Sequence, residues 1–257
     1  MERPAMHQRE LRRWRELLRQ RNATRGLLVA FEGPDGSGKT TQRKLFKSWL
    51  KQQGRHVVVT KWNSSALIKP IVKVRKQARA LSPEEFCLLH AADFRHRVET
   101  EVLPTLWHGG TVIADRYLFT GLARDAARGL DFDWILHAYA PILWPDLVFY
   151  FAVSPHTSAM RIAATREPSY YEAGQDITGM DNPLDSYTQF TSRVIREYES
   201  LALVFQFVTI DAERTIDEQH QQVRQHFAQA QRRSWLDFNI EPLVEWLSQH
   251  AQGSQLG

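Results

Sequence analysis

Short apolar runs alternate with longer amphipathic stretches along most of the chain. Five runs of five to seven residues, rich in Val, Ile, Leu and Phe, have the length and composition of buried strands. Between them, apolar residues recur every three or four positions, as they do on one face of a helix. This alternation predicts an α/β fold in which a parallel sheet carries helices on both faces. The predicted strands are residues 27–32, 56–60, 111–115, 147–153 and 206–210.

The predicted helices have recognisable ends. The first stops at Gly54, and the longest begins at Ser82 and Pro83, which favour a helix start, and is broken by Gly109 and Gly110. The polar stretch 166–183 contains glycine and proline and lacks clear periodicity, which predicts a mobile loop. The helical stretches are residues 41–53, 82–107, 155–164, 185–203 and 215–231.

The positive charge of the chain is concentrated at its N-terminus. Residues 1–25 hold eight arginines and three glutamates, a balance of +5, whereas the whole chain carries +4 and its remainder therefore −1. Apolar residues recur at helical spacing in this arm, so we interpret it as an amphipathic helix that docks on the domain. An arm that binds a membrane surface or a polyanion is the alternative. The apolar residues are Leu11, Trp14, Leu17 and Leu18.

We expect one domain between two extensions. The 257 residues suffice for one α/β core, which we place at residues 26–232 with a lid at about 165–183. The basic arm, residues 1–25, precedes this body, and residues 233–257 follow it. The stretch WLDFNIEPLVEWLSQ (235–249) is too apolar for a free tail, so we expect the C-terminal extension to pack on the body.

Composition excludes several classes of protein. With 43% hydrophobic and 24% charged residues the chain is ordinary for a globular protein, and no apolar run reaches the roughly 18 residues of a membrane span. The single cysteine, Cys87, allows no internal disulfide and predicts a cytoplasmic protein. The histidines show no metal-ligand spacing, and the basicity of the arm gives no clear indication of nucleic acid binding.

A glycine-rich loop follows the first predicted strand. GPDGSGKT (33–40) fits the phosphate-loop, or Walker A, pattern G-x-x-x-x-G-K-[ST] and lies between a strand and a helix. Its backbone N–H groups and the helix N-terminus suit a triphosphate, Lys39 the β- and γ-phosphates, and Thr40 a magnesium ion. The predicted ATP contacts are Gly33, Pro34, Asp35, Gly36, Ser37, Gly38, Lys39, Thr40 and Thr41.

Two further features point to an acceptor beside the nucleotide. Asp35 is repelled by a triphosphate, so we expect it to face an acceptor hydroxyl; the alternative is a solvent-facing or turn-capping residue. The third predicted strand ends in Asp115-Arg116-Tyr117, where an acid suits Mg²⁺ and an arginine suits a phosphate.

Together with the phosphate loop, the downstream blocks resemble those of thymidylate kinases. The resemblance covers roughly residues 26–228 and rests on four blocks in the family's order and spacing. It implies a P-loop kinase fold with a five-stranded parallel sheet and transfer of the γ-phosphoryl group of ATP to a nucleoside monophosphate. The blocks are FEGPDGSGKTTQ (31–42), HAADF to DRY (90–117), PDLVFYFAVSP (145–155) and an arginine-bearing loop after the next helix.

The resemblance also implies roles for individual residues. Asp35 would contact the acceptor sugar, and Arg116 would bind the acceptor phosphate. Asp115, with Thr40, would lie at the metal or the reacting phosphates. In the adenine region Arg161 would flank the base and Ala212 would lie in the nearby loop, while Arg166 would reach the phosphates from the lid. The implied catalytic residues are Lys39, Asp115, Arg116 and Arg166.

The sequence departs from the family mainly on the acceptor side. Two phosphate-reading arginines become Lys61 and Lys73, the thymine-stacking phenylalanine becomes His90, and the arginine that addresses the base edge becomes Phe94. An acceptor-pocket tyrosine becomes Arg124. Either aromatic ring of the helix stacks the base, or both are ordinary helix residues. In the lid, Tyr170, Tyr171 and Glu172 either contact the acceptor or fix the loop to the body.

Three functions are compatible with these observations. The first is an ATP- and Mg²⁺-dependent nucleoside monophosphate kinase whose acceptor is dTMP, and the second is a related kinase with another phosphorylated acceptor. The third is a nucleotide-binding regulator. The presence of Lys39, Thr40, Asp115 and Arg116 counts against it, because a protein that only binds a nucleotide needs no group for an acceptor phosphate. The family also implies a possible homodimer.

Overall fold

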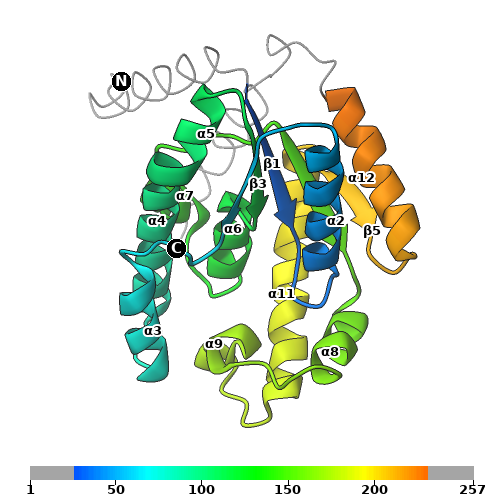
Figure 1. The fold of residues 1–257 in the computed structure, drawn as a ribbon. Coiled ribbons are helices and arrows are strands. Elements are labelled where there is room, and N and C mark those ends of the chain that lie inside the picture. Colours follow the sequence, from blue (N-terminus) through cyan, green and yellow to red (C-terminus); the bar gives the residue numbers. More distant parts are fainter. Residues whose placement is uncertain (1–25, 231–257) are drawn as a thin grey trace, which may run out of the picture.

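A five-stranded sheet, with all strands parallel, lies at the centre of the computed structural model, which describes residues 26–230 (Figure 1). The strand order is β2-β3-β1-β4-β5, which confirms the predicted fold class. The predicted strands are all present, with small shifts at their ends. They are β1 (Leu27–Glu32), β2 (Val57–Lys61), β3 (Thr111–Asp115), β4 (Leu147–Ala152) and β5 (Val208–Asp211).

Helices connect the strands. The long helical pattern of residues 82–107 is continuous but contains one π-helical turn, η1 (Val98–Val102), between α4 and α5. The helices are α2 (Lys39–Gln52), α3 (Lys69–Gln77), α4 (Pro83–Arg97), α5 (Leu103–Trp107), α6 (Leu118–Ala126), α7 (Phe132–Tyr139), α8 (Pro155–Ala163), α9 (Tyr170–Ala173), α10 (Gln175–Thr178), α11 (Pro183–Val204) and α12 (Ile216–Ala230).

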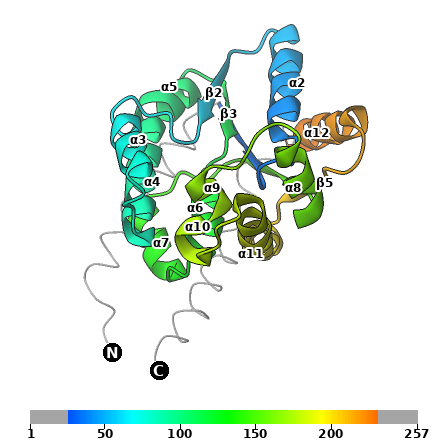
Figure 2. The same ribbon diagram turned by 90° about the horizontal axis from the view of Figure 1, so that it is seen from below.

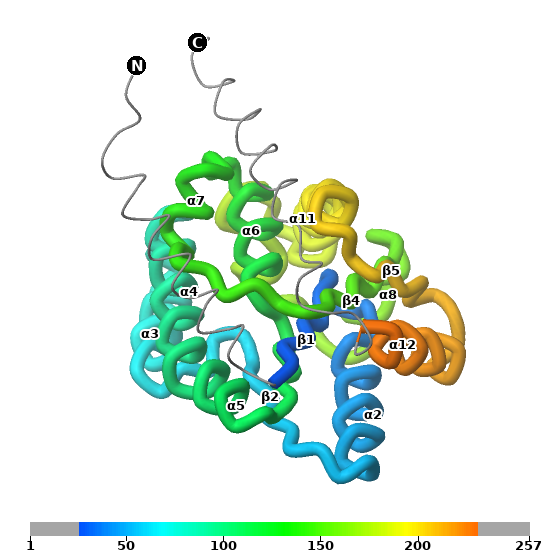
Figure 3. The backbone as a smooth tube through the Cα atoms, turned by 90° about the horizontal axis from the view of Figure 1, so that it is seen from above, coloured from blue at the N-terminus to red at the C-terminus, as the bar shows by residue number. Residues whose placement is uncertain are grey.

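The two faces of the sheet carry separate apolar clusters because successive side chains of a strand point to opposite faces. In β1, Leu28 and Ala30 pack into a cluster with α4, α5, α6, α7 and α11. Val29 and Phe31 pack into a second cluster with α2 and α12. The two helix layers are seen on either side of the sheet in the view from above (Figure 3).

The carboxyl ends of the central strands form the edge at which the phosphate loop begins. Phe31 pairs with Asp115, and Lys61 pairs with the same residue on its other side. This register brings the ends of β1, β2 and β3 together. Helices α9 and α10 lie across this edge, between α3–α4 and α8 (Figure 2).

The lid differs from the sequence prediction. Residues 166–183, expected to be a mobile loop, contain the two single-turn helices α9 and α10. A capping box between Ser169 and Glu172 starts α9, and Gly174, with a φ of 72°, ends it. These local signals are too short for a periodicity search to detect.

Three longer helices, α3, α6 and α7, were also missed. The predicted arm (1–25) and C-terminal extension (233–257) lie outside the described residues, so their docking stays a prediction. Within residues 26–230, no helix is both long and apolar enough to cross a membrane.

Candidate active site

The phosphate loop has a backbone that depends on its glycines. Gly33, Gly36 and Gly38 have φ values of 134°, 74° and 80°, which side-chain-bearing residues rarely adopt. A Cβ at Gly33 would also lie 2.7 Å from the Phe151 carbonyl oxygen. Helix α2 begins at Lys39, and no side chain caps it, so its positive end faces the loop. The loop therefore has the geometry of an anion site.

Lys39 lies folded into this loop. Its Nζ donates to the Pro34 carbonyl and, at 3.1 Å, to Ser37 Oγ. Burial, together with the nearby charge of Arg116, lowers the pKa of Lys39 to about 7. A triphosphate would reverse this shift because anionic oxygens favour the protonated ammonium.

Asp35 and Arg116, both predicted to face an acceptor, pair with each other beside the phosphate loop. Arg116 donates to Asp35 Oδ1 at 2.5 Å and to the Gly33 carbonyl at 3.0 Å. Arg124 approaches the other carboxylate oxygen at 3.6 Å. Burial alone would raise the pKa of Asp35, but the charges of Arg116, Lys39 and Arg124 hold it well below its usual range. Asp35 is therefore an ionised carboxylate that orients two arginines beside the phosphate loop.

Glu32 supports Arg116 from the end of β1, and the sequence analysis did not single it out. Its buried carboxylate accepts from the Tyr117 N–H and the Thr120 hydroxyl, both at 2.7 Å, and from Tyr198. Arg116 has a φ of 68°, a strained conformation for an arginine. The hydrogen bonds of Glu32 fix the residues that follow and so stabilise this turn. The sequence feature that could have identified Glu32 is an acidic residue within an otherwise apolar strand.

Oxygen ligands for a divalent cation lie nearby. Thr40 is exposed at the start of α2, and Asp115 lies at the end of β3, where its Oδ2 pairs with Arg43 Nε at 2.8 Å. A hydroxyl and a carboxylate are ligands that Mg²⁺ accepts when substrate phosphates supply the others. Among the described residues, no three His, Cys, Asp or Glu side chains gather to hold a metal by themselves.

The predicted adenine-side residues are brought together. Arg161 of α8 donates to the Gly36 carbonyl at 3.2 Å and to the Ala212 carbonyl at 3.1 Å. It therefore bridges the phosphate loop and the segment that follows β5.

The predicted lid arginine is engaged elsewhere. Arg166 makes a two-pronged ion pair with Glu172 of α9, at 2.5 and 2.7 Å, and its side chain is 51% exposed. The carboxylate of Glu172 holds the guanidinium as a phosphate would. Among the described residues, the Arg166 guanidinium donates to Glu172 and to the Glu167 carbonyl, and to no group of the phosphate loop.

Phe94 and His90, for which the sequence left base stacking and an ordinary helix position as alternatives, are both buried. Phe94 is fully buried and packs edge-on against Tyr117 and Tyr139. His90 is 1% exposed, with the rings of Phe86 and Trp62 stacked against it at centroid distances of 4.2 and 5.4 Å. In this structure neither ring offers an open face to a base.

The two lysines predicted to bind the acceptor lie at the surface. Lys61 and Lys73 are both exposed. Lys76, which the sequence analysis passed over, lies on the inner side of α3 instead. Its Nζ is 3.5 Å from His90 Nε2 and 4.7 Å from the centre of the Phe86 ring.

Arg124 and Arg128 connect the acceptor side to the lid. Both donate to the Tyr171 carbonyl, at 3.1 and 2.8 Å, and Arg128 also donates to Asp176 at 2.8 Å. We call these four residues the lid clasp. The buried Arg128 guanidinium lies over the rings of Phe86 and Phe190. The Tyr171 hydroxyl accepts from the Leu81 N–H, which favours fixation of the lid as the role of this tyrosine.

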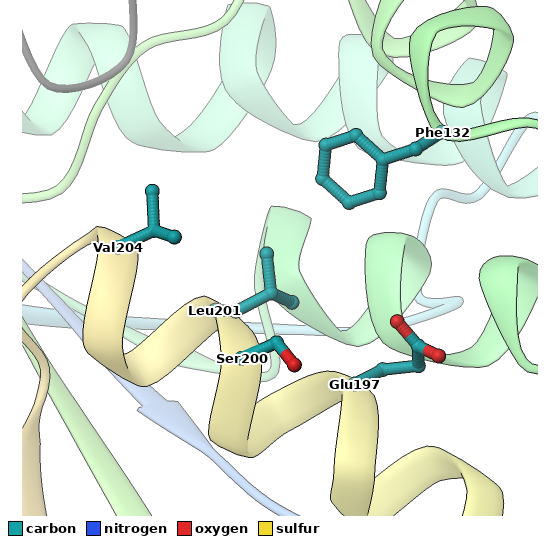
Figure 4. A pocket seen from close by; sticks show the side chains of 5 residues that line it. All are labelled: Phe132, Glu197, Ser200, Leu201 and Val204. Carbon is teal, nitrogen blue, oxygen red and sulfur yellow. The ribbon is translucent and has the colours of Figure 1, made fainter. Parts of the chain in front are cut away.

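A separate small pocket lies between α7 and α11. In the close-up, Phe132 of α7 faces the side chains of α11 across it (Figure 4). None of the predicted site residues lines it. Its lining residues are Phe132, Glu197, Ser200, Leu201 and Val204.

Comparison with known proteins identifies relatives over most of the chain. The family model described as thymidylate kinase matches residues 31–223. Probable thymidylate kinase 2 of Saccharolobus solfataricus is 41% identical over 196 residues, which cover 76% of this chain and 92% of the relative. Probable thymidylate kinase of Pyrococcus abyssi is 33% identical, covering 77% of this chain and 94% of the relative. Thymidylate kinase of Schizosaccharomyces pombe is 31% identical, covering 77% and 90%.

Proposed function

The chain belongs to the thymidylate kinase family, and from this membership we propose that it transfers the γ-phosphoryl group of ATP to dTMP, giving dTDP. The observation that carries the proposal is the Asp35–Arg116 pair directly beside Lys39. A protein that only bound a triphosphate would need no arginine oriented on the acceptor side of the loop. This argument disfavours the regulator hypothesis.

The residues of the chain supply positioning and positive charge, which are the main requirements of phosphoryl transfer. The loop backbone and Lys39 bind the triphosphate. Arg116, held by Asp35 and supported by Glu32, binds the acceptor phosphate and keeps it in line. Arg166 moves from Glu172 to the transferring phosphoryl group when the lid closes and excludes water.

The nucleotide and its metal have matching groups in the chain. Arg161, between Gly36 and Ala212, flanks the adenine. Thr40 and Asp115 would hold Mg²⁺ together with the phosphates, and the ion would supply positive charge that neutralises the phosphate oxygens. A cytoplasmic location and a homodimer remain part of the proposal.

A different phosphorylated acceptor is the second candidate. The buried Phe94 cannot read a base edge as the family's arginine does, so selectivity for thymine needs other groups.

An ATP-consumption screen across nucleosides and nucleoside monophosphates tests the proposal. We expect dTMP to stimulate ATP use and the Lys39→Ala variant to be inactive. A response to another nucleotide alone would favour the second candidate. A wild-type protein that binds ATP but consumes none with any acceptor would refute both.

A further inference from the structure

The pocket between α7 and α11 is mostly apolar, and we call it the α7–α11 pocket. Phe132 of α7 faces Leu201 and Val204 of α11 across it, and Glu197 and Ser200 complete its lining (Figure 4). Hollowed apolar surface favours an occupant, because covering the surface removes it from water. None of the residues assigned to ATP, Mg²⁺ or the acceptor lines this pocket, so the proposed function supplies no occupant for it.

The α7–α11 pocket lies toward the edge of the sheet that is opposite to the phosphate loop. All strands are parallel and β1 ends at the phosphate loop, so the strands begin at the opposite edge. Helix α11 ends at Val204, and β5 begins at Val208. The end of α11 therefore lies where β5 begins, and the pocket is lined by the last two turns of this helix.

The last described helix ends at the same edge. Helix α12 follows β5 and runs back along the sheet, and Phe227 in its last turn packs on Phe46 and Trp49 of α2 with centroid distances of 5.0 and 5.9 Å. Because α2 begins at the phosphate loop, this contact with its second half places the end of α12 at the opposite edge (Figure 1). Residues 231–234 can span about 14 Å when extended. The segment after them thus starts near the edge where the pocket lies.

The sequence of that segment alternates between apolar and polar residues. From residue 236 to residue 241 every second residue is apolar, and the residues between them are acidic or amide-bearing. Successive side chains of an extended chain point to opposite sides, so this pattern predicts one apolar side and one polar side. The apolar residues are Leu236, Phe238 and Ile240, and the polar residues are Asp237, Asn239 and Glu241.

We propose that residues 235–241 of this chain dock in the α7–α11 pocket, with their apolar side against Phe132 and Val204 and their acidic side toward water. The place where α12 ends and the alternating pattern both favour this occupant. Because the segment is tethered to α12, its effective concentration at the pocket is high, and a small buried area suffices for docking. The inference concerns a surface outside the kinase site and does not depend on the proposed function.

The docked segment leaves the candidate active site open. Tyr198 of α11 donates to Glu32 at 2.9 Å and so lies on the side of the helix that faces the sheet. Its neighbour Glu197 lines the pocket instead. The segment therefore covers α11 from the side away from the phosphate loop and the acceptor arginines. Loss of docking should accordingly change kcat by less than about threefold.

A disulfide trap in the full chain tests the docking. Ser200→Cys at the pocket is combined in turn with Leu236→Cys and with Ile240→Cys, which leave Phe238 in place. Docking should bring at least one pair within the Cα–Cα distance of about 7 Å that a disulfide needs, and mild oxidation should then link the pair within one chain. The control replaces Ser200→Cys by Lys69→Cys, at an exposed position of α3, and should form the bond at least about tenfold more slowly. Peptide mapping by mass spectrometry provides the measurement.

Thermal unfolding of the full chain gives a second readout. Phe238→Asp places a charge on the apolar side of the segment and should lower the Tm by about 2–5 °C, because the docked contact is lost. Val204→Asp removes the same contact from the pocket. Adding Phe238→Asp to Val204→Asp should lower the Tm no further, since one contact can be lost only once. Leu88→Asp, at an exposed leucine of α4, is the control with which Phe238→Asp should be additive.

Three outcomes would overturn the inference. The first is that neither cysteine pair forms a disulfide faster than its control. The second is a disulfide that links two chains, which would show that the pocket takes the segment of a second copy. The third is a Tm that does not respond to Phe238→Asp, or responds equally with and without Val204→Asp. None of these outcomes would affect the proposed kinase activity, which the ATP-consumption screen tests by itself.

Discussion

At the residue scale, Asp35 has an unusual position for a carboxylate in a phosphate loop. Its ionised form is kept by three basic side chains, Lys39, Arg116 and Arg124, which outweigh the effect of burial on its pKa. The Asp35 carboxylate in turn fixes the positions of the Arg116 and Arg124 guanidinium groups before any substrate binds. Preorganised charge of this kind avoids reorganisation during the reaction.

The role of Arg116 can be tested directly. Arg116→Ala should lower kcat/KM for the acceptor by about 10²- to 10³-fold, because a donor aimed at the phosphate is lost. The Kd for ATP should change by less than about threefold, since the loop backbone and Lys39 remain. Steady-state kinetics with each substrate varied, together with ATP titration calorimetry, provide the measurement. Equal losses for ATP and acceptor would contradict the assignment to the acceptor side.

Several residues of the site follow from local patterns, and several do not. The phosphate loop and Arg116 belong to contiguous motifs, so sequence alone identifies them. Lys76 and Arg128 belong to no motif, and their neighbours, His90 and Asp176, are 14 and 48 residues away. The partners of such residues are known only once the helices are packed. Phe94 is the opposite case. The resemblance to the family identifies its position in the sequence but does not predict that its ring is buried.

At the element scale, the lid is held by side chains of α6 and its C-terminal turn. In the lid clasp all three nitrogens of Arg128 donate, to Asp176, to the Tyr171 carbonyl and to the Arg124 carbonyl. The sequence predicted a mobile loop here because its polar composition gives no sign of these contacts. The long helices and the strands were predictable because their periodic patterns extend over many residues.

Loss of the clasp should loosen the lid. Arg128→Met removes these hydrogen bonds, and we expect acceptor-independent ATP hydrolysis to rise roughly tenfold because a loosened lid no longer excludes water. The substitution also leaves Asp176 buried without its partner, which should lower the free energy of unfolding by about 3–5 kcal/mol. The double variant that adds Asp176→Asn removes this unpaired charge and is measured beside the single variant. Arg95→Met breaks an exposed ion pair on α4 and is the control. Hydrolysis that stays at the wild-type level in both clasp variants would show that the clasp does not position the lid.

Helix α6 also carries a buried acid, Asp125, which packs near Cys87 and Tyr139. Burial raises its pKa from 3.8 to about 6, so the folded state disfavours the ionised form. This cost is absent below pH 3.8 and complete above pH 6. Asp125→Asn should therefore stabilise the fold by about 1–3 kcal/mol at pH 7.5 and by much less at pH 4. Urea unfolding at both pH values measures this, with the exposed Asp217→Asn as control; an equal gain at both would contradict the buried-charge explanation.

At the scale of the whole molecule, residues 26–230 form a complete three-layer arrangement. Each face of the sheet has its own apolar cluster, and helices within this range cover both. The family match lies inside the same range, and the relative from Saccharolobus solfataricus aligns over 92% of its own length with 76% of this chain. We therefore propose that the arm and the C-terminal extension are additions to a body that other members of the family possess.

A chain truncated to residues 26–232 should therefore fold and keep its kinase activity. Because the apolar residues of both clusters are retained, we expect a cooperative thermal transition within about 5 °C of the full chain and a kcat within about threefold. If the basic arm binds polyanions or anionic vesicles, that binding should disappear with residues 1–25, whereas deletion of residues 233–257 alone should leave it. Circular dichroism melting, kinetics and vesicle sedimentation compare the three chains. An insoluble or strongly destabilised truncated protein would mean that the apolar residues of 235–249 complete the core and are not an addition to it.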